Sequence, residues 1–133
     1  EANGLSVFPY SPAAGGVLSG KYSQQEKPTV GRLYSNPRYK DRYGEAWVHE
    51  TAAGFAAFCK NRGVHPVSMA VAWVGAHPAV TAPIIGARSV EQLQASLDSL
   101  KIEMTSALRA ELSALSRTPP PATDRLEEAM QSK

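Results

Sequence analysis

The chain has 133 residues, of which 43% are hydrophobic and 20% charged, and its formal net charge is +2. These values are typical of one soluble globular domain, and so small a charge gives no support for a nucleic-acid partner. A single cysteine excludes an internal disulfide, no signal peptide is recognisable, and prolines interrupt the most apolar region, so we expect a cytoplasmic protein without a membrane span.

The first predicted element is a buried strand over Leu5–Tyr10, with Pro9 near its end, where a missing N–H is tolerated. A loop of small residues follows at 11–16. The segment 21–44 is polar and rich in Pro, Gly, Arg and Tyr, and loops of this length are usually functional or mobile. Its basic and aromatic part, 32–43, is either a lid over a binding site or an ordinary solvated loop.

Helical spacing predicts two helices, over 45–62 with a stop at Gly63 and over 66–76. A second strand is expected over Ala82–Ile85, and two further helices follow, capped by Ser89 and Thr105. The buried positions expected in these last two helices are Val90, Leu93, Leu97, Leu108, Leu112 and Leu115. Strands that alternate with helices predict an α/β protein with a parallel sheet. Two strands cannot form a stable sheet, so further strands must come from elsewhere.

The turn at 83–92 is the strongest candidate binding motif. Ser89 is a good N-cap, and Gln92 three residues later completes a capping box, so a helix N-terminus follows a strand directly. Gly86 and Ala87 leave room for a ligand, and Arg88 adds a charged planar fork. This combination favours a phosphate. Many similar turns bind nothing, and Arg88 by itself would be a solvated charge or a salt-bridge partner.

Two segments together resemble the aldo-keto reductases: 7–22, and 67–74 followed by 82–93. The likeness is greatest to the bacterial-type and potassium-channel β-subunit branch. The resemblance implies a TIM-type (β/α)8 barrel. Residues 1–117 would be its C-terminal part, incomplete as given, with Leu5–Tyr10 as the seventh strand and Ala82–Ile85 as the eighth. Residues 118–133 would be a C-terminal tail.

The resemblance also implies binding of NADP(H). Tyr10, otherwise a core tyrosine, would stack on the nicotinamide ring. The pyrophosphate would lie against Ser11, Pro12, Ala13 and Gly15, and the 2′-phosphate against Gly86, Ala87 and Arg88. Gln92 and Ser96 would face the adenine. The sequence departs from the family pattern at Ala13, where Leu is common, and at Ala95 and Ser96, where adenine-bonding side chains are usual.

The family's catalytic Asp, Tyr, Lys and His motifs are not found in these residues, so no catalytic role is assigned here. The complete enzyme is expected to reduce an aldehyde or ketone substrate, and this fragment alone is expected to be inactive. The remaining barrel strands would come from the rest of the protein or from another chain. The alternative is a redox-sensing regulatory subunit with the same barrel, and a third reading is a barrel fragment without cofactor affinity. No metal site is expected, since the three histidines and Cys59 lack ligand spacing.

Overall fold

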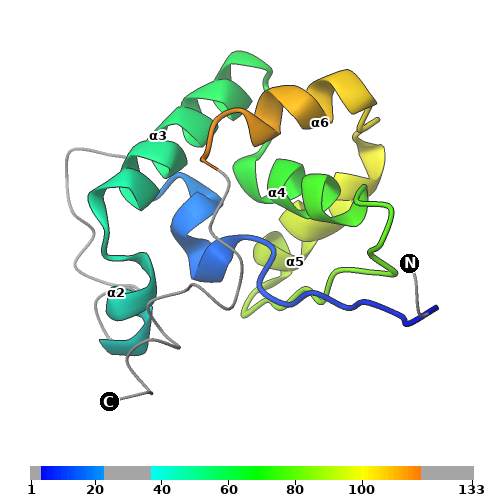
Figure 1. The fold of residues 1–133 in the computed structure, drawn as a ribbon, viewed down its shortest axis with the longest axis horizontal. Coiled ribbons are helices and arrows are strands. Elements are labelled where there is room, and N and C mark those ends of the chain that lie inside the picture. Colours follow the sequence, from blue (N-terminus) through cyan, green and yellow to red (C-terminus); the bar gives the residue numbers. More distant parts are fainter. Residues whose placement is uncertain (1–3, 23–36, 118–133) are drawn as a thin grey trace.

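The computed structural model describes residues 4–22 and 37–117. Figure 1 shows α3 (Ala46–Asn61), α4 (Pro66–Gly75) and α6 (Ser106–Ser113) packed together, with α5 (Val90–Leu97) below them. The N-terminal segment runs along the lower edge and leads into the 3-10 helix η1 (Ala14–Ser19). No helix in the described ranges is both long and apolar enough to cross a membrane.

The boundary between α3 and α4 follows local signals. Gly63 has φ +64°, in the left-handed region that favours glycine, and it ends α3. Pro66 is the first residue of α4, where a missing N–H costs nothing. Nδ1 of His65 accepts a hydrogen bond from the N–H of Val67 at 3.2 Å and so caps the same helix. The helices predicted over 45–62 and 66–76 are confirmed.

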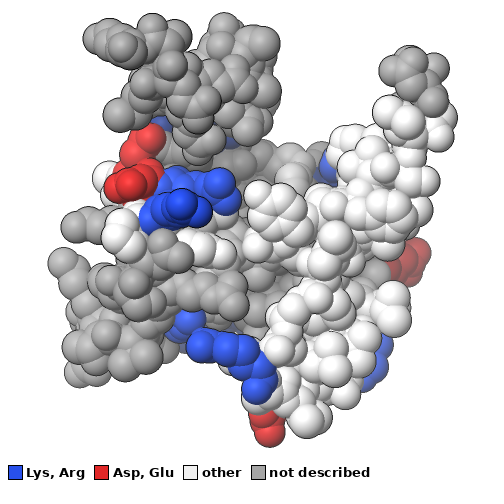
Figure 2. Space-filling model, turned by 90° about the horizontal axis from the view of Figure 1, so that it is seen from below, with Lys and Arg blue, Asp and Glu red and all other residues white. Residues whose placement is uncertain are grey.

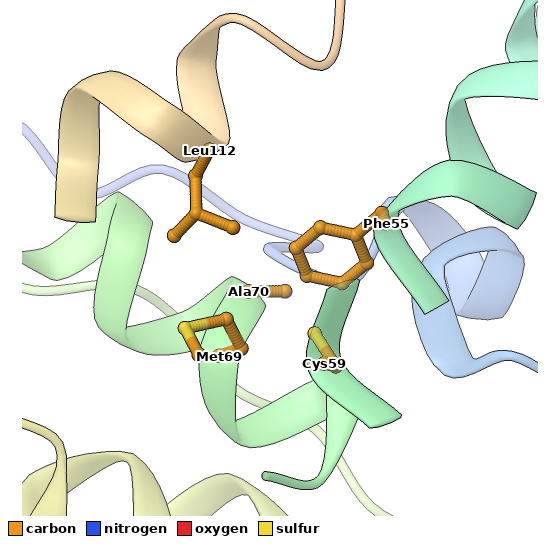
Figure 3. Packing of buried hydrophobic residues seen from close by; sticks show 5 residues of the cluster. All are labelled: Phe55, Cys59, Met69, Ala70 and Leu112. Atoms are coloured by element: carbon orange, nitrogen blue, oxygen red, sulfur yellow. The ribbon is translucent and has the colours of Figure 1, made fainter. Parts of the chain in front are cut away.

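The core lies where three helices meet. Figure 3 shows five side chains directed into the space between α3, α4 and α6: Phe55, Cys59, Met69, Ala70 and Leu112. Met69 and Cys59 are fully buried, which is typical of a core methionine and an unreactive thiol. Apolar burial of this kind is worth about 1.5–3 kcal/mol for each large side chain. The cluster therefore holds the three helices as one body.

The helix α6 behaves as the sequence predicts. Oγ1 of Thr105 accepts from the N–H of Leu108 at 3.2 Å, which is an N-cap bond. Leu112 is buried, and Leu108 and Leu115 pack against the core cluster. A second, smaller cluster of Val17 and Ala52 fastens η1 to α3. The loop before η1 is therefore held against the helical body.

The two predicted strands are corrected. Leu5–Tyr10 and Ala82–Ile85 lie side by side in parallel, but they share only an isolated bridge between Tyr10 and Ile84, and no regular strand occurs within the described residues. Pro9 and Pro83 lack an N–H to donate to a ladder, and no further strand among the described residues pairs with either segment. The first segment is also exposed rather than buried, with Leu5 at 74%.

The expected burial of one face of α5 is also wrong. Val90 is 77% exposed, and Leu93 and Leu97 are exposed as well. In the 3-10 helix η2 (Asp98–Lys101), which continues α5, Leu100 is 86% exposed. The opposite face of α5 meets α4, where the hydroxyl of Ser68 donates to a backbone carbonyl of α5. Helical spacing identifies an apolar face, but it does not supply a covering partner.

The sequence did not predict α2 (Pro37–Tyr43), which lies within the long polar loop. A lid was one of the two predictions for the segment 32–43, and only residues 37–43 of that segment are described by the structure. Residues 23–36 and the predicted tail at 118–133 lie outside the described residues.

Candidate functional site

A groove of about 700 Å³ runs between the loop before η1, the turn at 84–88 and α5. This volume is in the range of ordinary small-molecule sites. Every site residue predicted from the sequence lines it: Tyr10, Ser11, Pro12, Ala13, Gly15, Gly86, Ala87, Arg88, Gln92 and Ser96. Two segments far apart in the sequence are therefore combined into one surface. Figure 2 shows the underside of the molecule, where basic side chains lie at several places around a broad uncharged area.

Hydrogen bonds define the turn that precedes α5. Oγ of Ser89 accepts from the N–H of Gln92 at 3.3 Å, as predicted for an N-cap. Oε1 of Gln92 accepts from the N–H of Arg88 at 3.0 Å, one residue earlier than in an ordinary capping box. The Gln92 side chain thus holds the Arg88 backbone in place. No ion pair engages the Arg88 side chain within the described ranges, which leaves its guanidinium available to a ligand.

An acidic group stands beside this turn. Glu91 lines the groove, and a hydrogen bond from the Ser89 hydroxyl, with a second from its own backbone, lowers the pKa of the Glu91 carboxyl. Among the residues that the structure describes, the charged side chains along the groove are Lys21, Arg88 and Glu91. The two cations outnumber the carboxylate, so the groove favours an anionic ligand.

The segment from Ser11 into the first turn of η1 has an unusual backbone. Ser11 and Ala14 have φ values of 55° and 51°, and Gly15 and Gly16 have φ values of 64° and 98°. Left-handed conformations at residues other than glycine are strained and cluster at functional sites. At Gly15 an added Cβ would lie only 2.3 Å from Cε1 of Tyr39 in α2. Gly15 therefore serves both the conformation of this segment and the close approach of α2.

Helix α2 also reaches Tyr10. Hydrogen bonds with the side chains of Tyr10 and Tyr43 raise the pKa of Arg42 above its usual value. The Tyr10 side chain is nevertheless 68% exposed, so much of its ring remains open. The structure thus brings α2 to the end of the groove where the sequence predicts ring stacking.

The structure qualifies the role expected for Ser96. Its side chain is buried, and its hydroxyl donates to the carbonyl oxygen of Gln92 at 3.3 Å along the same helix. The neighbouring carbonyl of Ala95 accepts from the hydroxyl of Ser68 at 2.5 Å. Ser96 lines the groove, but its hydroxyl proton is already used within the helix.

The sequence analysis missed four polar residues of the groove: Ser19, Lys21, His65 and Glu91. Nζ of Lys21 lies 4.8 Å from the centre of the Tyr22 ring, and its side chain passes close to Gly16. A lysine five residues after a loop of small residues was a usable signal, because such a loop leaves room for an anion and the lysine supplies charge. His65 gave no local signal, since it reaches the groove only through the packing of α4 against α5.

Cys59 is not part of the groove. Burial raises the pKa of its thiol to about 11, so the group is neutral and unreactive at ordinary pH. Among the described residues, no cluster of three or more His, Cys, Asp or Glu side chains is suited to a metal ion.

With this geometry in view, comparison with known proteins identifies the family. The model of the aldo/keto reductase family matches residues 1–117, so the chain belongs to that family. The resemblance recognised in the sequence is thereby confirmed.

Individual relatives come from both branches that the sequence suggested. Protein tas of Escherichia coli (strain K12) is 30% identical over 115 residues, which make up 86% of this chain and 33% of that protein. The uncharacterized oxidoreductase YrpG of Bacillus subtilis (strain 168) is 36% identical over 101 residues, 76% of this chain and 29% of that protein. A probable voltage-gated potassium channel subunit beta of Oryza sativa subsp. japonica is 27% identical over 133 residues, 98% of this chain and 37% of that protein. The chain spans about a third of the length of these curated relatives.

Proposed function

We propose that this chain is the cofactor-binding, C-terminal part of a TIM-type barrel that uses NADPH to reduce an aldehyde or ketone in the cytoplasm. The observation that carries the proposal is the single groove that unites all of the predicted site residues. When bound, NADPH supplies the hydride.

The residues of the groove suit each part of such a cofactor in turn. The open ring of Tyr10 is available for stacking on the nicotinamide, which is worth about 1 kcal/mol. Lys21 and the loop from Ser11 to Gly15 suit the pyrophosphate, because they combine a cation with small residues. Arg88, at the N-terminus of α5 and free of ion pairs within the described residues, suits the 2′-phosphate.

The exposed apolar residues support an incomplete barrel. Leu5, Val7, Phe8 and Ile84 are exposed along the bridged segments, and Val90 is exposed on α5. Contiguous apolar exposure of this kind marks a surface that another element covers. We assign that cover to the remaining strands and helices of the barrel, from the rest of the protein or another chain. The groups that donate a proton to the carbonyl would also come from there, so residues 1–133 alone would reduce nothing.

A second candidate is a regulatory subunit that binds the cofactor without turning over a substrate. It is favoured by the likeness to a probable potassium channel subunit beta across 98% of this chain. In both candidate functions the groove would bind the cofactor in the same way. Steady-state assays of the complete protein with NADPH and a panel of aldehydes and ketones separate them, because only the reductase consumes NADPH with the carbonyl compound present.

The experiment that tests cofactor binding is titration of the complete protein, wild type and Arg88→Ala, with NADPH and NADH. We expect Arg88→Ala to weaken NADPH binding by about 10- to 100-fold, as for loss of a charge-assisted hydrogen bond, and to leave NADH binding unchanged. Arg62→Ala is the matched control, because Arg62 pairs with Glu111 away from the groove. Equal weakening of both nucleotides would contradict the 2′-phosphate assignment.

A further inference from the structure

His65 stands where the groove meets a second recess. It lines the groove described above, and it also lines a recess of about 500 Å³ beside α5. The second recess includes Glu91, Ala95 and Asp98, so His65 lies across from the middle of α5. The imidazole thus belongs to both spaces.

The orientation of the ring is set by the helix it caps. Nδ1 of His65 accepts from the N–H of Val67 at 3.2 Å, so Nδ1 carries no proton and the ring proton is on Nε2. The structure gives Nε2 no partner among the described residues, and the side chain is exposed. The exposed ring and its Nε2–H donor are therefore left for a ligand.

The opposite wall offers little competition for a ligand. Ala95 presents only a methyl group, and the hydroxyl of Ser96 is bonded to the carbonyl of Gln92. In the second recess, Oδ1 of Asp98 accepts from Nε2 of Gln94 at 2.9 Å and pairs with Lys101 at 2.8 Å. The bonds from Lys101 and Gln94, with a smaller electrostatic contribution from His65, lower the pKa of the Asp98 carboxyl. Among the described groups at this end, the His65 ring and the side-chain amide nitrogen of Gln92 each keep a donor without a hydrogen-bond partner.

We propose that His65 binds the purine ring of the dinucleotide, through its Nε2–H and the face of its imidazole. Adenine has ring nitrogens that accept hydrogen bonds and a flat face on which an imidazole can stack. His65 would thus replace the hydrogen bonds that side chains at 95 and 96 supply in the family pattern. This inference rests on the proposed function, because that proposal places the adenosine beside α5.

The test uses His65→Asn in the complete protein. Asparagine is a favoured N-cap, so the variant keeps the cap on α4 and removes only the ring and its Nε2–H. The ligands are NADPH, adenosine 2′,5′-bisphosphate, and reduced nicotinamide mononucleotide, which lacks the adenine. We expect the first two to bind about 5- to 10-fold more weakly, as for loss of one hydrogen bond, and the third to bind as in the wild type.

His77→Asn is the matched control. Nδ1 of His77 accepts from the N–H of Ala79 at 3.1 Å, the same type of bond, but His77 lines neither space. This variant should bind all three ligands as the wild type does. If His65→Asn leaves NADPH and the bisphosphate unaffected, or weakens all three ligands equally, the His65 assignment is overturned while the proposed function stands. If the wild-type protein binds neither NADPH nor the bisphosphate, the proposed function fails, and the assignment fails with it.

Discussion

The N–H of Ile84 donates to the carbonyl oxygen of Pro9 at 2.8 Å, and this bond joins the two halves of the groove. Nearby, the N–H of Thr81 donates to the carbonyl of Val7 at 2.8 Å, and the N–H of Val7 donates to Oγ1 of Thr81 at 3.1 Å. Tyr10 is the last residue of the first segment, so these few bonds set its distance from the turn before α5. Because few hydrogen bonds join the two segments, a single substitution can test their contact.

Replacing Thr81 with valine removes the acceptor for the N–H of Val7 and keeps the shape of the side chain. We expect a loss of about 0.5–1.5 kcal/mol in the free energy of unfolding, measured by urea denaturation, together with weaker NADPH binding. Thr81→Ser keeps the hydroxyl and is the control, which should bind NADPH as the wild type does. Equal behaviour of the two variants would mean that this bond does not hold the segments in register.

Replacing Gly15 with alanine should disturb the first turn of η1 in two ways. The residue has φ +64°, and the new Cβ would lie 2.3 Å from Cε1 of Tyr39. Gly4→Ala is the control for backbone strain alone, since Gly4 has φ +61° and open space around it. We expect Gly4→Ala to cost about 1 kcal/mol in unfolding free energy and Gly15→Ala to cost more. Adding Tyr39→Ala to Gly15→Ala should recover the difference, which thermal unfolding would reveal.

Replacing Ser89 with alanine should weaken both the fold and the site. The N-cap bond to the N–H of Gln92 is lost, at a cost of about 0.5–2 kcal/mol in unfolding free energy. The hydroxyl also lowers the pKa of Glu91, so its contribution is present above the unfolded pKa of that carboxyl and is lost as pH falls through the folded pKa. The stability difference between wild type and variant should therefore shrink in acid. Thr105→Ala removes a similar cap far from the groove and should lower stability without changing NADPH affinity.

The Cys59 thiol should be inert in the folded protein and reactive after unfolding. Burial raises its pKa to about 11 from a reference value of 9.0, so little thiolate forms at pH 8. Alkylation with iodoacetamide, followed by mass spectrometry, should proceed only when denaturant is added. Because the folded pKa is the higher one, the thiol's contribution to stability is complete below about pH 9 and falls away as pH rises toward 11. Cys59→Ala should remove that part of the loss of stability at high pH. Rapid labelling of the native protein would contradict the assignment of Cys59 as a buried, unreactive thiol.

The caps and ends of several helices could be predicted from the sequence. Ser89 and Thr105 cap helices because a hydroxyl reaches an N–H a few residues later, and Gly63 ends α3 because it alone turns left-handed without strain. Ten residues that line the groove were also predicted from the sequence, through two motifs that resemble a known family.

The tertiary structure decided which of these residues meet. The bridge between Tyr10 and Ile84 and the entry of His65 into the groove depend on contacts between distant segments. The same holds for the exposed face of α5, where Val90 belongs to an apolar pattern without a partner among the described residues. A side chain's residue type and spacing are local properties, whereas burial depends on what packs against it. The sequence therefore determined α3, α4, α5 and α6, and only the packing decided which faces are covered and which side chains share a site.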